Sequence, residues 1–329
     1  MAEERFLVTG AMGCLGAWVI RRLLDEGVPA IGLDLSTNTS RLRLICGDDE
    51  LEKVSLIAGD ISDPAVVARA VEEHGITRIV HCAALQVPFV RADPSRGARV
   101  NVLGTVNVLE AVKTFRDQVK GIAYASSAAV FGAPDRYERG LIDDDSPQYP
   151  EGSLYGVFKH TNELTARVYA AESGINAVGL RPFVVYGAGR DQGMTSGPTV
   201  AILAAVTGVP YRVSFRGPMY FNFARDAAAA FIAAARYHAT QPLVLNVPGR
   251  TATVEDIIEV VEGIVPEARG TITVSDLELA APSRVDSSKA SALLGLKELT
   301  PLAQGVGQTL EVFRKGLHRG ILRAPQPAV

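Results

Sequence analysis

The chain has 329 residues, of which 47% are hydrophobic, and its 33 basic and 36 acidic side chains leave a net charge of −3. A near-neutral charge without a basic stripe argues against nucleic acid as a partner, and the composition is that of a folded chain rather than a disordered one. Three scattered cysteines form neither a disulfide framework nor a metal-ligand cluster, so we expect no metal and a reducing, cytoplasmic setting.

In the first half of the chain, short apolar runs rich in β-branched side chains alternate with longer segments of helical periodicity. We expect strands at Phe6–Thr9, Ala30–Leu33, Val54–Ala58, Arg78–Cys82, Gly121–Ala125 and Ala177–Leu180. We expect helices at Cys14–Glu26, Pro64–His74, Pro94–Phe115 and Ser153–Ser173. Strands that alternate with helices form right-handed β-α-β units, so the pattern predicts an α/β fold with a doubly wound parallel sheet covered on both faces.

In the second half, the alternation gives way to shorter elements among frequent Gly and Pro residues, which indicates a smaller substrate-binding lobe. We expect a first domain at residues 1–180 and this C-terminal lobe at 181–329, with part of 210–250 returning to the first domain. The most apolar window, Ala227–Ala235, is nine residues long. A membrane span needs about 20 residues, so the window predicts a buried helix and no membrane partner.

Three glycines, Gly10, Gly13 and Gly16, directly follow the first expected strand and open the first expected helix. Glycines at such a junction permit a tight turn and let the backbone approach a pyrophosphate, while free N–H groups at the helix start face the anion. The GxxGxxG spacing in this context predicts a Rossmann-like dinucleotide site. A glycine-rich turn without a ligand is the alternative.

Asp34 comes at the end of the second expected strand, 18 residues after Gly16. A carboxylate at this place accepts hydrogen bonds from the ribose hydroxyls of NAD and repels the extra phosphate of NADP. NAD is therefore the expected cofactor. Arg41 and Arg43 follow closely in the sequence and leave NADP as the alternative.

Tyr155 and Lys159 are four residues apart and share one face of an expected helix. A neighbouring ammonium stabilises a phenolate and brings the pKa of a tyrosine toward the working range of a base. Ser126 and Ser127 end the preceding strand at the sheet edge where ligands bind, and a hydroxyl there can hold a substrate oxygen. The three residue types in this order predict proton transfer at an alcohol.

Taken together, these motifs resemble the extended short-chain dehydrogenase/reductase family, the group of NAD-dependent sugar epimerases and dehydratases. The resemblance rests on the glycine motif, Asp34, Asp60-Ile61, the runs 81–84, 101–105 and 124–132, Tyr155 with Lys159, and the runs 181–187, 285–290 and 294–295. These matches span nearly the whole chain in the order of the family. The matches are highly specific for the fold and the cofactor, and they are less specific for the substrate.

The resemblance implies a role for each matching residue. The cofactor contacts would be Gly10, Gly13, Cys14, Leu15, Gly16, Asp34, Asp60, Ile61, Ala83, Ala84, Asn101, Tyr155, Lys159 and Pro182. Tyr155 would be the catalytic base, Lys159 would hold the nicotinamide ribose, and Ser127 would orient the reacting hydroxyl. Such relatives form homodimers by pairing the helices expected here at Pro94–Phe115 and Ser153–Ser173.

The sequence departs from the family pattern at two places that bear on the substrate. Ala128 and Ala129 replace the Asp-Glu pair of the sugar dehydratases, which argues against dehydration. Val184 stands where nucleotide-sugar enzymes carry Asn, and Thr273–Ala280 lacks the basic residue that would bind a diphosphate. A smaller polyhydroxylated substrate, such as a sugar, sugar acid or polyol, is therefore favoured, although Arg212, Arg216 or Arg284 could supply the missing charge.

The predicted function is that of an NAD-dependent oxidoreductase that acts on a secondary alcohol of a carbohydrate-like substrate, as a dehydrogenase or an epimerase. The alternatives are a nucleotide-sugar 4-epimerase of the UDP-hexose type with tightly bound NAD and, disfavoured by the intact Ser-Tyr-Lys set, a non-catalytic NAD-binding protein. The candidate substrate residues are Gln86, Ser126, Ser127 and Arg190. His81 is expected to be a satisfied core histidine, residues 143–145 a solvated loop, and Arg225-Asp226 an ion pair or a helix cap.

Overall fold

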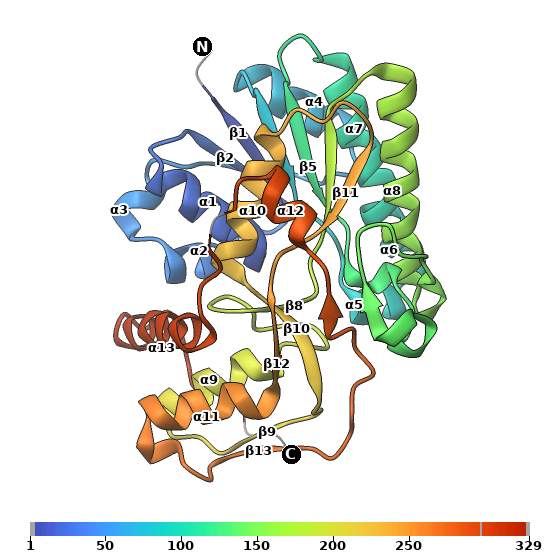
Figure 1. Cartoon of the computed structure of the whole chain (residues 1–329). Coiled ribbons are helices and arrows are strands. Elements are labelled where there is room, and N and C mark those ends of the chain that lie inside the picture. The colour runs from blue at the N-terminus through green and yellow to red at the C-terminus, as the bar shows by residue number, and fades with distance from the viewer. Residues whose placement is uncertain (1–3, 297, 327–329) are drawn as a thin grey trace.

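The computed structural model describes residues 4–296 and 298–326, and its centre is a seven-stranded parallel sheet (Figure 1). The strands are β1 (Phe6–Thr9), β2 (Ala30–Asp34), β3 (Ser55–Ala58), β4 (Arg78–His81), β5 (Gly121–Ala125), β7 (Ala177–Arg181) and β11 (Leu243–Asn246). They lie in the order β11-β7-β5-β4-β1-β2-β3, so the chain leaves β1 in one direction and returns to its other side with β4. The predicted doubly wound parallel sheet is confirmed.

Helices cover both faces of this sheet because consecutive strand residues point to opposite sides. Phe6 and Val8 pack on the face covered by α1 (Cys14–Asp25) and α10 (Ala224–Arg236), whereas Leu7 packs on the opposite face. That opposite face is covered by α4 (Pro64–Glu73), α7 (Gly104–Thr114) and α8 (Leu154–Ser173). The predicted buried helix at Ala227–Ala235 lies within α10.

The helix expected at Pro94–Phe115 is present as an unbroken helical stretch, but it consists of three consecutive segments. These are α6 (Pro94–Ala98), the π-helix η1 (Arg99–Leu103) and α7, preceded by the short helix α5 (Val87–Ala92). The widened turn η1 carries Asn101, whose buried side chain hydrogen-bonds to the backbone of Leu85 rather than to its own helix. A π-turn thus brings α6 and α7 against the loop after β4, and such turns often occur near functional sites.

Much of the second half of the chain forms smaller sheets and helices, and α9, α11 and α13 lie below the main sheet (Figure 1). The strands β8 (Val184–Tyr186), β10 (Pro218–Phe223) and β12 (Arg250–Thr253) form one sheet, β9 (Tyr211–Val213) pairs with β13 (Ile272–Val274), and β6 (Leu141–Ile142) pairs with β14 (Arg284–Val285). The helices of this part are α9 (Gly197–Thr207), α11 (Val254–Ile264), α12 (Ser288–Leu293) and α13 (Leu302–His318). Two short helices of the first half, α2 (Ser40–Ile45) and α3 (Asp48–Leu51), follow β2. Between these elements, α10 and β11 return to the main sheet.

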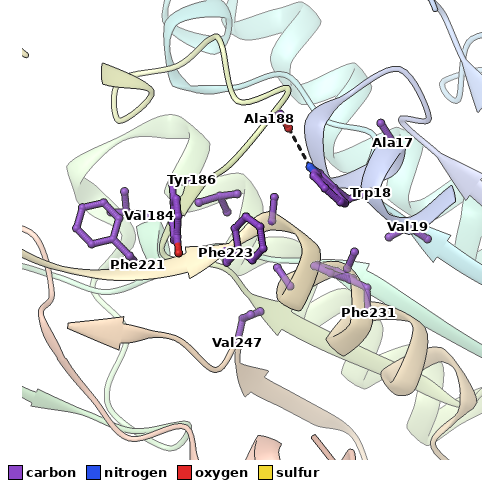
Figure 2. Packing of buried hydrophobic residues seen from close by; sticks show 14 of the residues in the cluster. Ala17, Trp18, Val19, Val184, Tyr186, Ala188, Phe221, Phe223, Phe231 and Val247 are labelled. Carbon is purple, nitrogen blue, oxygen red and sulfur yellow. Dashed lines mark hydrogen bonds between the residues drawn. The ribbon is translucent and has the colours of Figure 1, made fainter. Parts of the chain in front are cut away.

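A cluster of aromatic side chains joins the two parts of the chain (Figure 2). The ring of Phe223 lies 6.1 Å from that of Trp18 and 5.2 Å from that of Tyr186, measured between centroids. The indole Nε1 of Trp18 donates a hydrogen bond of 2.9 Å to the carbonyl of Ala188 (Figure 2). This bond holds the segment that follows β8 against α1, next to the glycine motif.

Two expectations for charged segments are corrected by the structure. Asp144 is buried, not solvated, because its carboxylate accepts a hydrogen bond from the backbone N–H of Asn246 at the end of β11. Burial raises the pKa of Asp144 to about 6. Arg225 and Asp226 do not pair with each other, since Arg225 donates to Gln308 and Asp226 accepts from Thr300. Both residues thus attach α10 to the C-terminal part of the chain.

None of the described helices is long and apolar enough to cross a bilayer. Residues 4–296 and 298–326 contain no group of three His, Cys, Asp or Glu side chains placed to hold a metal ion.

His81 at the end of β4 is a satisfied core histidine, as predicted. Its Nδ1 lies 2.7 Å from the hydroxyl of Thr9 and its Nε2 lies 3.1 Å from the hydroxyl of Thr105. Burial, with a smaller contribution from the charge of Lys159, lowers the pKa of His81 to about 3. The imidazole is therefore neutral in the folded protein at neutral pH.

This depressed pKa predicts a loss of stability in mild acid. Between pH 6.5 and about 3 the unfolded chain binds a proton at His81 that the folded chain does not. The free energy of unfolding is thus expected to fall by about 1.4 kcal/mol for each pH unit below 6.5 on account of this group. Urea unfolding of the wild type and of His81→Asn between pH 4.5 and 7 measures it, because the contribution of Asp144, which has the opposite sign, cancels in the comparison. Equal pH slopes would contradict the prediction.

Candidate active site

A cleft of about 1120 Å³ opens at the carboxyl ends of the parallel strands, where the strand order reverses between β1 and β4. Ligands of doubly wound sheets bind at this place, and the volume suffices for a dinucleotide and a small substrate together. The predicted site residues that line the cleft are Gly10, Gly13, Cys14, Leu15, Gly16, Asp34, Asp60, Ile61, Ala83, Ala84, Gln86, Ser126, Ser127, Tyr155, Lys159, Pro182 and Arg190. The fold therefore gathers them from seven separate parts of the sequence.

Asn101 is the exception, and its predicted place beside the cofactor is corrected. Its amide accepts a hydrogen bond from the N–H of Leu85 and donates one to the carbonyl of Leu85, and only 1% of the residue is exposed. Asn101 is not among the residues that line the cleft. It holds the loop after β4, which carries Ala83 and Ala84, in place from behind.

The glycine motif packs so tightly that side chains are excluded at two of its positions. Gly10 has a φ of +72°, and a Cβ there would lie 2.7 Å from the backbone nitrogen of Ala83. A Cβ at Gly16 would lie 2.2 Å from the carbonyl oxygen of Gly10. No side chain caps the N-terminus of α1, which leaves its first N–H groups pointing into the cleft. These uncapped donors at the positive end of a helix suit a pyrophosphate.

A substitution of Gly16 by Ala is expected to weaken dinucleotide binding and destabilise the protein. The new methyl group would meet the backbone of Gly10, which cannot yield without moving the loop, and overpacking of this kind costs about 1–3 kcal/mol. Thermal unfolding and fluorescence titration with NADH measure the two effects. The matched control is Gly263→Ala in α11, where a Cβ meets no atom within 4 Å and helix propensity should raise stability slightly. Equal behaviour of both variants would contradict the prediction.

Asp34 and the neighbouring arginines decide how the adenosine end of the cleft is charged. The Asp34 carboxylate accepts hydrogen bonds from the N–H groups of Met12 and Ser36 at the end of β2. Arg41 pairs with Asp191 and also donates to the carbonyl of Met12, and Arg43 pairs with Asp48. Both arginines that left NADP open thus have carboxylate partners, which favours NAD over NADP.

Asp60 and Ile61 form the floor of the same end of the cleft. The Asp60 carboxylate accepts from the N–H of Ser62, and the carbonyl of Ile61 accepts from the amide of Asn107 on α7. The side chain of Ile61 packs against Gly104, where a Cβ would lie 2.6 Å from its Cδ1. Their contacts therefore fix the positions of both residues at the edge of the cleft.

Ser127, Tyr155 and Lys159 meet at the other end of the cleft. The Ser127 hydroxyl accepts a bond of 3.1 Å from the N–H of Ala129 and also hydrogen-bonds to the phenol of Tyr155. The Nζ of Lys159 donates to the carbonyl of Ala125 at 2.5 Å and lies 5.7 Å from the centroid of the Tyr155 ring. Helix α8 begins with Ser153 as its N-cap, so both functional side chains lie in its first two turns.

Burial controls the acidity of these groups before any ligand is bound. It raises the pKa of Tyr155, and the Ser127 hydrogen bond and the charge of Arg190 oppose this effect. Burial also lowers the pKa of Lys159 to about 8. Both shifts have the same cause, because burial disfavours the charged form of each group, the phenolate of Tyr155 and the ammonium of Lys159.

Sequence reasoning missed a buried ionic network directly behind this site. Glu163 is 1% exposed, and its carboxylate binds the guanidinium of Arg181 through two hydrogen bonds of 2.8 Å. It also accepts from Ser126, at 2.5 Å, and from Gln148. The Ser126 hydroxyl, predicted to contact substrate, is thus directed at Glu163. One feature of the sequence could have indicated that Glu163 lies near the site. Glu163 follows Lys159 by four residues, so the two side chains share one face of the same helix.

The C-terminal lobe contributes an apolar wall to the cleft. Among the described lining residues beyond Thr195 are only Leu279, Ala280, Ala281 and Pro282. Arg284 donates to the carbonyl of Arg139, and Arg216 forms ion pairs with Glu255 and Asp276. Neither these two arginines nor Arg212 lines the cleft. None of the three possible substitutes for a diphosphate-binding residue therefore reaches the site.

Comparison with known proteins agrees with this architecture. UDP-glucose 4-epimerase of Azospirillum brasilense is 31% identical over 188 residues, 57% of this chain and 51% of that protein. UDP-glucose 4-epimerase of Mycolicibacterium smegmatis is 28% identical over 322 residues, 94% of this chain and 98% of that protein. The structure of UDP-glucuronic acid 4-epimerase from Bacillus cereus in complex with NAD superimposes with a TM-score of 0.77 at 25% identity, covering 96% of this chain and 98% of the other.

The extent of these matches differs. The chain spans about half the length of several of the curated relatives that it matches. The model of the NAD dependent epimerase/dehydratase family matches residues 6–247, which include the whole main sheet and the cleft residues as far as Thr195. The chain therefore belongs to the NAD dependent epimerase/dehydratase family.

Proposed function

We propose that this protein is an NAD-dependent oxidoreductase that acts on a secondary alcohol of a polyhydroxylated, carbohydrate-like substrate. The observation that carries the proposal is the convergence of Ser127, Tyr155 and Lys159 in a cleft that also presents the glycine motif and Asp34. A non-catalytic NAD-binding protein would not need this proton-transfer set. Reduction and oxidation of an alcohol are the chemistry that the set and the cofactor can perform together.

The residues present fit NAD. The uncapped start of α1 would hold the pyrophosphate, Asp34 the adenosine ribose, and Asp60 and Ile61 the adenine. Ala83, Ala84 and Pro182 line the middle and far part of the cleft, and Lys159 would hold the nicotinamide ribose. When bound, NAD supplies the hydride acceptor.

The chain's own residues would handle the proton. Ser127 would hold the reacting hydroxyl of the substrate beside the phenol oxygen of Tyr155, which as phenolate takes the hydroxyl proton. The Lys159 ammonium would stabilise that phenolate. The apolar side chains of Leu279, Ala281 and Pro282 would exclude water from the same space. If the ketone leaves, the enzyme is a dehydrogenase, and if the ketone rotates and is reduced on its other face, it is an epimerase.

The substrate that the cleft favours is not a nucleotide sugar. A diphosphate needs charge-assisted partners, and the described lining beyond Thr195 contains no charged residue. A sugar, sugar acid or polyol has no such requirement. A nucleotide-sugar 4-epimerase is the second candidate, because a relative with that name aligns over 94% of this chain.

We also infer a homodimer in the cytoplasm, formed through α7 and α8. Helix α8 exposes Leu154, Leu164 and Val168, with exposed fractions of 49%, 46% and 51%, and Leu103 before α7 is 45% exposed. Apolar side chains exposed on neighbouring helices support burial against a second copy. A solution mass of one chain by light scattering would contradict the inference.

The experiment that tests the proposed function is a substrate screen with purified protein and NAD⁺. Free sugars, polyols, aldonates, uronates and UDP-hexoses are each supplied, and the absorbance of NADH is followed. Stoichiometric NADH formation with a free carbohydrate is the result expected of a dehydrogenase. Formation of an epimer from a UDP-hexose, with NAD remaining bound to the protein and no reaction with free carbohydrates, would overturn the proposed substrate and establish the second candidate.

A further inference from the structure

The guanidinium of Arg190 lies in the cleft without a carboxylate partner among the described residues. Its Nη1 lies 3.4 Å from the Oε1 of Gln86 and its Nη2 lies 3.3 Å from the hydroxyl of Thr195. The Nε is buried and has no hydrogen-bond partner. Five N–H donors are thus served by two long, neutral contacts, which leaves the positive charge uncompensated.

The other arginines of the cleft are in a different situation. Arg41 is paired with Asp191, and Arg136 is paired with Glu151. Arg96 also lines the cleft but is exposed to solvent on the short helix α6. Among the described arginines of the cleft, Arg190 is therefore the partly buried one that has no carboxylate partner.

The surroundings of Arg190 are built to hold this side chain in one place. Gly193 has a φ of +98°, and a Cβ there would lie 2.2 Å from the Oε1 of Gln86 and 3.1 Å from the Nη2 of Arg190. Two residues before Arg190, the carbonyl of Ala188 is held by the indole of Trp18 (Figure 2). The guanidinium is thus preorganised, which reduces the entropic cost of binding a ligand.

The position of Arg190 relates it to the reacting atoms. Arg190 lines the same cleft as Ser127 and Tyr155, and its charge lowers the pKa of Tyr155. Gln86 stands directly before α5, after the loop of Ala83 and Ala84. A group bound between these side chains would therefore adjoin the hydroxyl held by Ser127.

We propose that Arg190, with Gln86 and Thr195, binds the carboxylate of the substrate, so that the natural substrate is a sugar acid and not a neutral sugar or polyol. The inference rests on the proposed function and specifies its substrate class. The planar fork of an arginine forms two parallel hydrogen bonds with a carboxylate. One unpaired guanidinium matches the single negative charge of a carboxylate, whereas a diphosphate carries at least two and would need a second cation.

Matched substrate pairs test the proposal by kinetics. In each pair a carboxylate is exchanged for a neutral group on the same carbon chain: gluconate with glucitol, galactonate with galactitol, glucuronate with glucose, and galacturonate with galactose. NADH formation is expected from the acid of a reacting pair, with kcat/KM about 100-fold above its neutral counterpart. Arg190→Gln is expected to remove that preference, and Arg190→Lys to retain part of it because the charge stays but the fork is lost.

The control variant is Arg225→Gln. Arg225 is also partly buried, also contacts a glutamine at 3.4 Å and lies outside the cleft, so its loss should leave the acid preference unchanged. Binding is measured separately by titration calorimetry of the same pairs into the NADH-loaded protein, which cannot oxidise an alcohol. Acids are expected to bind about 100-fold more tightly than their neutral counterparts, and only when Arg190 is present.

The two measurements separate this inference from the proposed function. Arg190-dependent binding of acids without turnover would support the carboxylate site and contradict the proposed oxidoreductase activity. Oxidation of a neutral polyol that Arg190→Gln leaves unchanged would support the activity and overturn the carboxylate site. A loss of NADH affinity in Arg190→Gln with no change in acid preference would also overturn it, because Arg190 would then bind the cofactor. Equal affinity for the acid and its neutral counterpart would also overturn the carboxylate site.

Discussion

Replacing Tyr155 with Phe is expected to lower kcat by about 100- to 10,000-fold, the usual contribution of general acid–base catalysis. The substitution removes the phenol oxygen that hydrogen-bonds to Ser127 and leaves the ring on α8. Because the backbone of the glycine motif and Asp34 are untouched, the affinity for NADH should change by less than about threefold. Initial rates with the substrate found in the screen, and fluorescence titration with NADH, measure the two quantities.

A second tyrosine provides the control for the loss of a phenol. Tyr211 in β9 is partly buried, burial raises its pKa as it does that of Tyr155, and it does not line the cleft. Tyr211→Phe should keep the wild-type rate. If Tyr155→Phe retained more than a tenth of the wild-type kcat, the assignment of Tyr155 as the base would fail.

The second large effect is expected for Glu163→Ala, which should lower the free energy of unfolding by about 3–5 kcal/mol. The side chains of Glu163 and Arg181 are each 1% exposed, so removal of the carboxylate leaves a buried guanidinium without its counter-charge. The guanidinium also stacks on Phe131 and donates to the carbonyl of Asp144, which keeps it from turning toward water. A fall in Tm of roughly 10 °C is the expected result of thermal unfolding.

The control for this prediction is an exposed ion pair. Glu311 pairs with Lys315 on α13, and the two side chains are 64% and 68% exposed. Glu311→Ala should change stability by less than about 0.5 kcal/mol, because exposed pairs are screened by water. Glu163→Gln, which preserves the shape of the side chain, keeps the test informative if the alanine variant fails to fold. A Tm for Glu163→Gln within 1 °C of the wild type would show that the buried charge contributes little.

The buried network also bears on the site through Ser126. Burial raises the pKa of Glu163, but its hydrogen bonds to Arg181, Ser126 and Gln148 outweigh this effect and hold the pKa below its usual range. The carboxylate therefore stays ionised and fixes the hydroxyl of Ser126, directly before Ser127. The sequence analysis treated both serines as substrate contacts, but the fold gives the first a structural partner and leaves the second facing Tyr155.

The sequence by itself determined the α/β class, the six strands of the first half, the glycine motif and the Tyr155–Lys159 spacing. Each of these is a local pattern: a strand is encoded by its apolar run, a helix by its period, and a pair of side chains on one helix face by four residues of separation. The family resemblance extended this reading to Asp60, Ala83 and Ala84, which line the cleft as expected.

Only the tertiary structure decided which of the polar residues have partners. Asn101 binds Leu85 and not the cleft, Ser126 binds Glu163, and Arg41 is paired with Asp191, which lies 150 residues away in the sequence. The seventh strand, β11, and the unpaired guanidinium of Arg190 likewise depend on segments brought together from distant parts of the chain. Periodicity carries no information on such pairs, because a side chain's charge is balanced by what the fold places beside it and not by its neighbours in sequence.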